Sequence, residues 1–178
     1  AVGLSSSFIE PLEASSIGIS IQQSFLLMHL ITNYHKNDID LYNKKFINIV
    51  ENTRDFVLLH YLCGKKGSNF WNEFKPNLPE SLSKKLETWK YRLPLAEDFK
   101  GPYLLFNSEN FIIILKELNL LNKKTIKKEF NSLSNSHKNW VLHSVKTAIE
   151  NNNYKGNYQG HKSFLNNLII SNKTGKLY

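Results

Sequence analysis

The sequence predicts a mainly α-helical protein with a short strand and a loop at its N-terminus. Apolar residues recur at helical spacing over three long segments, residues 15–35, 41–63 and 78–92. Ala1–Leu4, in contrast, is a short apolar run that is typical of the end of a buried strand. With 178 residues and 41% hydrophobic composition, the chain is long enough for one domain with a core.

The first loop carries more local chemistry than a helix start needs. Pro11 fixes its own φ and favours extended backbone before it, so Phe8–Leu12 is expected to be an ordered loop. A helix is expected to begin at Ser15 and Ser16, where the first backbone N–H groups lack intrahelical partners and the helix dipole is positive. These amides are candidates for holding a small anion beside Glu13. Spacing alone favours the alternative, in which a serine caps the helix and Glu13 complements the dipole.

The second helix, expected over residues 41–63 with Gly64 as its stop, carries the string RDFVLLHY. Arg54 and Asp55 at the start of that string are typical of a surface ion pair. His60 is interpreted as a buried, hydrogen-bonded structural histidine, because nothing near it in the sequence forms a nucleophile and base pair.

The rest of the chain is expected to be helical scaffold. Aromatic residues in the loop 69–79 favour packing of the helical layer over stacking of a flat substrate, and the helix over 78–92 follows. The tail, residues 122–178, predicts one or two helices, a polar break over 151–160 and a short final helix over 161–170.

Charge and cysteine content limit the function classes. The net charge of +8 comes from scattered Lys pairs that share their segments with Glu, which indicates a solvated surface and no nucleic-acid partner. The single cysteine, Cys63, excludes an internal disulfide and favours a reducing, cytoplasmic compartment. No apolar run reaches the roughly 18 residues of a spanning helix, so no membrane partner is predicted. No His, Cys and Asp cluster has metal-ligand spacing, so no metal is expected.

The N-terminal string resembles the signature of flavin-dependent tryptophan halogenases. The matching residues are Ala1–Leu4, Phe8–Glu13 and Ile17, with Ala14–Ser16 in the turn; RDFVLLHY and the pair Phe70 and Trp71 are similar to the family as well. The resemblance implies that Glu13 orients the substrate or a hypohalous acid at the reacting carbon. It further implies that the Ser15 and Ser16 amides border a halide site. Leu4 and Ile17 match positions that touch the flavin.

The resemblance also implies the reaction and its partners. FADH2 from a separate flavin reductase reacts with O2 and halide, and the resulting hypohalous acid reaches a small aromatic substrate. The sequence holds no Gly-x-Gly-x-x-Gly string, and the family's catalytic lysine is not found in it. We therefore expect a C-terminal part of a halogenase that is inactive alone. Residues 1–20 would end a missing FAD-binding α/β module and carry the catalytic loop, and residues 21–178 would form the helical substrate side.

Residues 101–121 resemble the family segment in which two tyrosines help to hold the amino-acid part of free tryptophan. Phe111 and Ile112 stand at the matching positions and cannot hydrogen-bond a carboxylate or an ammonium group. The expected substrate is therefore an indole or phenol type of aromatic and not free tryptophan, with Phe111 and Ile112 as substrate-binding residues.

Two alternatives remain open at this point. In the first, the chain is a non-catalytic helical remnant or interaction module, which the absence of the flavin fingerprint and of the catalytic lysine favours. In the second, it belongs to a related flavin monooxygenase that hydroxylates without halide, although Glu13 and the string before it favour the halogenase branch.

Overall fold

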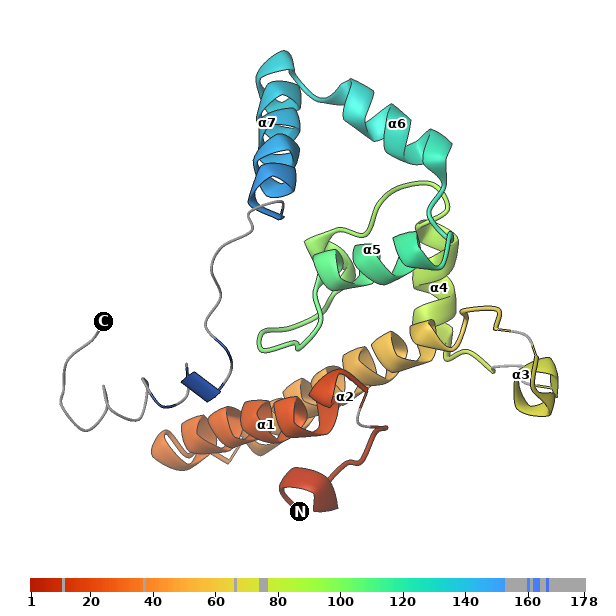
Figure 1. Ribbon diagram of the computed structural model, residues 1–178. Coiled ribbons are helices and arrows are strands. Elements are labelled where there is room, and N and C mark those ends of the chain that lie inside the picture. The colour runs from red at the N-terminus through yellow and green to blue at the C-terminus, as the bar shows by residue number, and fades with distance from the viewer. Residues whose placement is uncertain are drawn as a thin grey trace. The chain divides into compact units, whose positions relative to one another are not determined.

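The computed structural model describes residues 1–10, 12–36, 38–65, 67–73, 77–152, 160, 162, 163 and 166, and its described part is mainly α-helical, as predicted (Figure 1). The helices are α1 (Ser15–Thr32), α2 (Asp38–His60), α3 (Asn69–Glu73), α4 (Glu80–Thr88), α5 (Ser108–Glu117), α6 (Lys123–Ser132) and α7 (Asn135–Asn152). Short 3-10 turns lie at Gly3–Ser5, Leu12–Ala14 and Ala96–Asp98. The chain divides into two compact units, residues 1–132 and 133–178.

The predicted N-terminal strand is wrong. Gly3–Ser5 forms a single 3-10 turn, and no strand occurs among the described residues. Gly3 has φ +68°, a left-handed conformation that lies outside the extended region of a strand. Its amide donates to Gln23 Oε1 on α1 at 2.7 Å, and Ser6 Oγ donates to the same oxygen at 3.0 Å. The N-terminus is therefore docked on a helix side chain and not on a sheet ladder.

α1 and α2 pack side by side in the first unit (Figure 1). The buried apolar residues between them are Ile19 and Leu26 of α1 and Ile49 of α2. α1 ends at Thr32, earlier than the predicted residue 35, and α2 begins at Asp38, earlier than the predicted residue 41. Acidic side chains in the first turn of α2 complement the positive end of the helix dipole, which explains the earlier start.

A second core cluster joins the C-terminal half of α2 to α4 and α5. Its buried residues are Phe56, Leu59, Trp89, Phe106, Phe111 and Leu115. The Phe111 ring centroid lies 5.1 Å from that of Phe56, 5.5 Å from Trp89 and 5.0 Å from Phe99. The rings of Phe56 and Trp89 meet the Phe111 ring edge-on, an arrangement that aromatic quadrupoles prefer. The centre of this core is Phe111 of α5. The described aromatic residues of the segment 69–79, which were predicted to pack this layer from a loop, do not belong to it: residues 69–73 form α3, and Phe70 is 56% exposed.

Asp98 fixes the segment that follows α4. One of its carboxylate oxygens accepts hydrogen bonds from Trp89 Nε1 at 2.8 Å, from the Leu95 amide at 3.0 Å and from Arg92 at 2.7 Å. Its other oxygen is paired with the same guanidinium. The hydrogen bonds from Arg92, together with those from the Leu95 amide and Trp89, hold the pKa of the Asp98 carboxyl well below its usual value.

α1 keeps one apolar face uncovered in the described residues. The exposed side chains on it are Ile17, Ile21, Phe25 and Met28, with exposed fractions of 66, 51, 48 and 52%. The segment Leu12–Thr32 has a mean hydropathy of 1.2 and is, by length and composition, apolar enough to cross a membrane. Core helices pass the same test, and the opposite face of α1 packs on α2 through Ile19 and Leu26.

The second unit contains α7. Its described contacts are local: Lys146 and Glu150 form an ion pair of 3.9 Å one turn apart, and Ser134 Oγ lies 2.9 Å from His137 Nδ1 at the start of the helix. The prediction of one or two helices for the tail is met by α6 and α7. The predicted polar break over 151–160 and the final helix over 161–170 lie largely outside the described residues.

Candidate functional site

The candidate site consists of Ile9, Glu10 and Leu12–Ala14, which lead into α1, together with Ser15 and Ser16, with which α1 begins. Ser15 Oγ donates to the Glu10 carbonyl at 2.9 Å, and Ser16 Oγ donates to the Ile9 carbonyl at 2.8 Å. Both serines are buried, with exposed fractions of 1 and 7%. The N-cap residue of α1 is Ala14, without a side-chain cap, so serine capping is not what the structure shows. The serine hydroxyls instead hold the carbonyls of Glu10 and Ile9, and the anion-binding role of the Ser15 and Ser16 amides stays a prediction.

The backbone of this loop is strained at the predicted catalytic residue. Glu13 has φ 56° and ψ 29°, and Ala14 has φ 53° and ψ 26°. A side chain in this left-handed region costs about 1–3 kcal/mol, and such strain persists only where surrounding contacts hold it. Two such residues in succession turn the chain sharply into α1. The exposed Glu13 carboxylate therefore stands on a tightly constrained turn directly before the helix N-terminus.

Tyr61, directly after α2, contacts this loop from a distant part of the sequence. Its hydroxyl donates to Glu10 Oε2, across 51 residues. This hydrogen bond raises the pKa of Tyr61, because losing the phenolic proton would remove the bond and place a second negative charge beside Glu10. The Tyr61 ring also lies 5.9 Å, between centroids, from the Trp71 ring of α3. No local pattern in the sequence pointed to this link.

The residues predicted to touch the flavin are both exposed. Leu4 has an exposed fraction of 58% and Ile17 one of 66%. They offer apolar surface beside the loop, but a dinucleotide is held by a strand, a Gly-rich turn and a helix. The described residues contain no strand and the sequence contains no such Gly-rich string, so they do not form an FAD-binding cradle.

The predicted substrate-binding residues lie on α5, which begins with reciprocal hydrogen bonds between Asn107 and Asn110. Phe111 is fully buried, with an exposed fraction of 0%, and its ring is covered by the aromatic core. Ile112 is half-buried. Within the described residues Phe111 presents no surface to a ligand. Contact of these two positions with a substrate stays a prediction.

Asp55 has a different place from the expected surface ion pair. Its side chain is 1% exposed and accepts hydrogen bonds from Arg54 at 2.9 Å, Ser81 Oγ at 3.2 Å and Lys85 Nζ at 3.2 Å. A buried charge is tolerated when it is paired and hydrogen-bonded in this way, so Asp55 joins α2 to α4. His60 is hydrogen-bonded as predicted, with Nδ1 donating to the Phe56 carbonyl at 2.9 Å, but it is half-buried and not buried.

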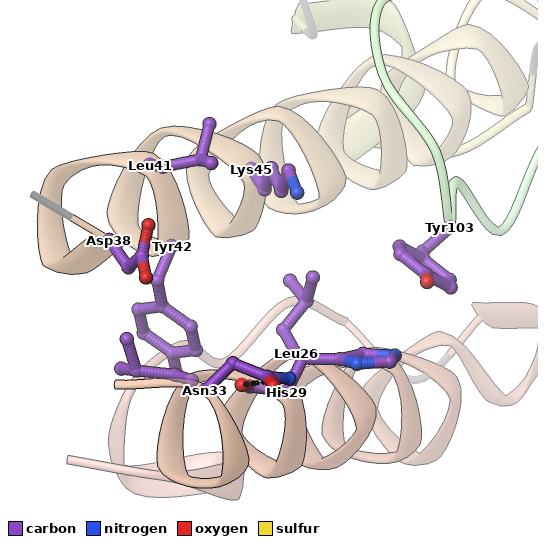
Figure 2. Close-up of a pocket in the computed structure, with 9 residues that line it drawn as sticks. Leu26, His29, Asn33, Asp38, Leu41, Tyr42, Lys45 and Tyr103 are labelled. Carbon is purple, nitrogen blue, oxygen red and sulfur yellow. Dashed lines mark hydrogen bonds between the residues drawn. The ribbon is translucent and has the colours of Figure 1, made fainter. Parts of the chain in front are cut away.

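A cavity of about 290 Å³ opens where α1 ends and α2 begins (Figure 2). Its lining residues are Leu26, His29, Leu30, Asn33, Asp38, Leu41, Tyr42, Lys45 and Tyr103. The Tyr103 ring faces His29, with 6.4 Å between ring centroids. Leu26 lies about 16 Å further along α1 than Ser15, at 1.5 Å per residue. The cavity is therefore separate from the Glu13 loop.

Known proteins match this chain over half of its length or more. The family model described as Tryptophan halogenase matches residues 1–130. The tryptophan 6-halogenase SttH of Streptomyces toxytricini is 34% identical over 104 residues, which is 55% of this chain and 20% of the relative. The 7-chloro-L-tryptophan 6-halogenase KtzR of a Kutzneria species is 32% identical over 103 residues, 54% of this chain and 20% of the relative.

Solved structures agree with these relatives. The structure of SttH is similar with a TM-score of 0.59 and 26% identity, over 74% of this chain and 30% of that chain. BrvH, a flavin-dependent halogenase from Brevundimonas sp. BAL3, is similar in fold with a TM-score of 0.67 and 23% identity, over 94% of this chain and 34% of that chain. The chain spans about a fifth of the length of the curated relatives that it matches. The family match covers the Glu13 loop and the helices that hold it, and this chain belongs to the tryptophan halogenase family.

Proposed function

We propose that this chain is part of a flavin-dependent halogenase and that Glu13 is its catalytic group. The observation that carries the proposal is the strained turn at Glu13 and Ala14, which holds an exposed carboxylate directly before the N-terminus of α1. Strain of this kind gathers at functional sites. The family match over residues 1–130 and the names of the relatives support the halogenase assignment.

The step proposed at this loop is the transfer of halogen from a hypohalous acid to an aromatic carbon. The oxygen–halogen bond breaks, a carbon–halogen bond forms, and the ring proton combines with the released hydroxide to give water. Positive charge develops on the ring as the new bond forms. A fixed carboxylate at Glu13 stabilises that charge most in the transition state, which is where stabilisation raises the rate.

The halide and the flavin have different places in this proposal. The backbone amides of Ser15 and Ser16, at the positive end of α1, border the halide site. Reduced FAD, replenished by a separate flavin reductase, supplies the hypohalous acid from O2 and halide when it is bound elsewhere in the enzyme. Leu4 and Ile17 contribute exposed apolar surface toward it. The whole enzyme is proposed to be cytoplasmic, with residues 1–20 on the flavin side and 21–178 on the substrate side.

The proposed substrate is an indole or phenol type of aromatic without a free amino-acid group. Phe111 and Ile112 carry no hydrogen-bonding side-chain atom, and the Phe111 ring packs in a core of aromatic and aliphatic side chains. A carboxylate or an ammonium group placed against these two side chains would lose hydration without gaining a hydrogen bond from either of them.

The test is a segment exchange, because the chain spans only a part of its relatives. Residues 1–130 replace the matching part of the S. toxytricini halogenase, and the product is assayed with a flavin reductase, FAD, O2 and halide. Glu13→Gln is expected to lower the halogenation rate about 100-fold while FAD affinity stays unchanged. Glu97→Gln, at an exposed glutamate in the turn Ala96–Asp98, is the matched control.

Each outcome of the exchange decides something. Equal rates for the exchanged enzyme and its Glu13→Gln variant would remove the role given to Glu13. A preference for free tryptophan over indole and phenol would overturn the substrate proposal. An enzyme that binds FAD but halogenates none of these compounds would favour the non-catalytic interaction module. If the long exchange does not bind FAD, residues 8–17 alone are exchanged.

A further inference from the structure

We propose that Tyr61 is a positioning residue, whose hydroxyl clasps Glu10 and thereby holds the loop that carries Glu13. This inference rests on the proposed function of Glu13. The Tyr61 hydroxyl donates to the side chain of Glu10, three residues before Glu13, so the action proposed for Tyr61 runs through Glu10. The three residues involved are Glu10 of the loop, Ser15 at the start of α1 and Tyr61 directly after α2.

Glu10 is the anchor of the loop because it is held at two points. Its carbonyl accepts hydrogen bonds from the Leu12 amide at 2.8 Å and from Ser15 Oγ at 2.9 Å. Its side-chain carboxylate accepts the hydrogen bond from Tyr61. The backbone contacts close the segment between Glu10 and Ser15 into a ring, and Glu13 and Ala14 lie inside that ring.

The ring alone does not fix where Glu13 lies relative to the rest of the first unit. Both hydroxyl contacts of the loop, from Ser15 and Ser16, come from α1, to which the loop is already joined by the chain. The contact from Tyr61 comes from the turn directly after α2. It therefore sets the direction of the ring against α2 and opposes rotation of the loop about the start of α1.

Tyr61 is itself held in place on its other side. Its ring lies 5.9 Å from the Trp71 ring, and Lys65 Nζ lies 5.9 Å from the Trp71 ring centroid. Phe in place of Tyr61 keeps the ring contact and removes only the hydroxyl. Tyr61→Phe therefore tests the hydrogen bond between Tyr61 and Glu10 without disturbing the ring packing. A hydrogen bond to a carboxylate is among the stronger kinds in proteins, so its loss is expected to be measurable at the loop.

The first readout is hydrogen exchange in the 178-residue chain, which needs neither flavin nor turnover. Tyr61→Phe is expected to speed exchange about 10-fold in peptides that cover residues 8–16, while peptides from the middle of α2 keep their protection. Glu10→Ala is expected to have the same effect, and Glu10→Gln a smaller one, because an amide oxygen still accepts a hydrogen bond. The double variant Tyr61→Phe with Glu10→Ala is expected to equal either single variant, since the two side chains share one contact.

Tyr91→Phe is the matched control, because Tyr91 follows α4 and is 80% exposed. Unchanged exchange over residues 8–16 in Tyr61→Phe would overturn the proposal, and so would additive effects of Tyr61→Phe and Glu10→Ala. If Tyr61→Phe also loses protection in α2, Glu10→Ala decides alone, because Glu10 is exposed and its truncation leaves the Tyr61 ring in place.

The second readout separates this inference from the proposed function. In the exchanged halogenase, Tyr61→Phe is expected to lower kcat about 10-fold with KM and FAD affinity unchanged, as for a misplaced catalytic group. It is expected to have no further effect in a Glu13→Gln background. If Tyr61→Phe speeds hydrogen exchange in the loop but Glu13→Gln halogenates at the normal rate, the contact between Tyr61 and Glu10 is supported and the catalytic role of Glu13 is rejected. If Tyr61→Phe leaves hydrogen exchange in the loop unchanged but Glu13→Gln is inactive, the positioning role of Tyr61 is rejected and the catalytic role of Glu13 is supported.

Discussion

The Glu13 loop and the α5 core are held in place by different kinds of interaction. The loop is exposed at Glu13, has two left-handed residues and is held by hydrogen bonds from Ser15, Ser16 and Tyr61. The segment around Phe111 is buried and is held by ring packing without directional bonds from its own side chain. Ring packing supplies stability, whereas hydrogen bonds fix direction at a small net gain in stability. The α5 core therefore stabilises the fold, whereas the contacts of the Glu13 loop fix the position of the loop.

The largest effect on stability is expected from Phe111→Ala. The substitution removes a fully buried ring that contacts Phe56, Trp89 and Phe99, and it leaves a cavity at the junction of α2, α4 and α5. The free energy of unfolding is expected to fall by about 3–5 kcal/mol. Urea unfolding of the 178-residue chain, followed by circular dichroism, measures the change. A loss below about 1 kcal/mol would mean that Phe111 is not the centre of this core.

A smaller effect is expected from acid, through Asp98. Its pKa is lowered in the folded chain, so the ionised form stabilises the fold above the unfolded-state pKa of about 3.9, and that contribution is lost as the pH falls toward the folded value. The free energy of unfolding is expected to decline from about pH 4 downward. In Asp98→Asn the decline is expected to be shallower. Urea midpoints measured between pH 5 and pH 2 check this, and parallel curves for the two proteins would contradict it.

The smallest effect on stability is expected from Ser15→Ala. The variant removes one neutral hydrogen bond, to the Glu10 carbonyl, and is expected to cost about 1 kcal/mol. Its effect on halogenation in the exchanged enzyme is expected to be larger than that of Phe111→Ala at a temperature where both variants are folded. Urea unfolding and a rate assay on the same samples measure the two quantities. A larger loss of halogenation rate in Phe111→Ala than in Ser15→Ala would contradict the assignment of stability to the α5 core and of positioning to the Glu13 loop.

The sequence was informative where one local pattern decides the structure. Apolar spacing was sufficient for the existence of α1 and α2, but three of their four ends differ: α1 ends at Thr32 instead of 35, and α2 runs from Asp38 to His60 instead of 41–63. The family signature pointed to the loop and to Glu13. The N-terminal strand was wrong because apolar composition does not reveal that Gly3 adopts a positive φ and docks on Gln23.

Contacts between distant parts of the chain were out of reach. Asp55 looks like half of a surface ion pair beside Arg54, and its burial follows only from the approach of Ser81 and Lys85 on α4. The link between Tyr61 and Glu10 crosses 51 residues and has no local pattern. Phe111 was placed on the substrate side by its match to the family, whereas its burial depends on three rings from other segments.

The ring that Ser15 closes with the Glu10 carbonyl has a consequence for how this loop tolerates change. The hydroxyl reaches the carbonyl at 2.9 Å only because a fixed number of residues lies between them. An inserted or deleted residue would shift Ser15 out of reach and release both left-handed residues at once, whereas a different side chain at Leu12 keeps the spacing. Chain length is therefore the quantity that this loop constrains, although surface loops in general accept insertions readily.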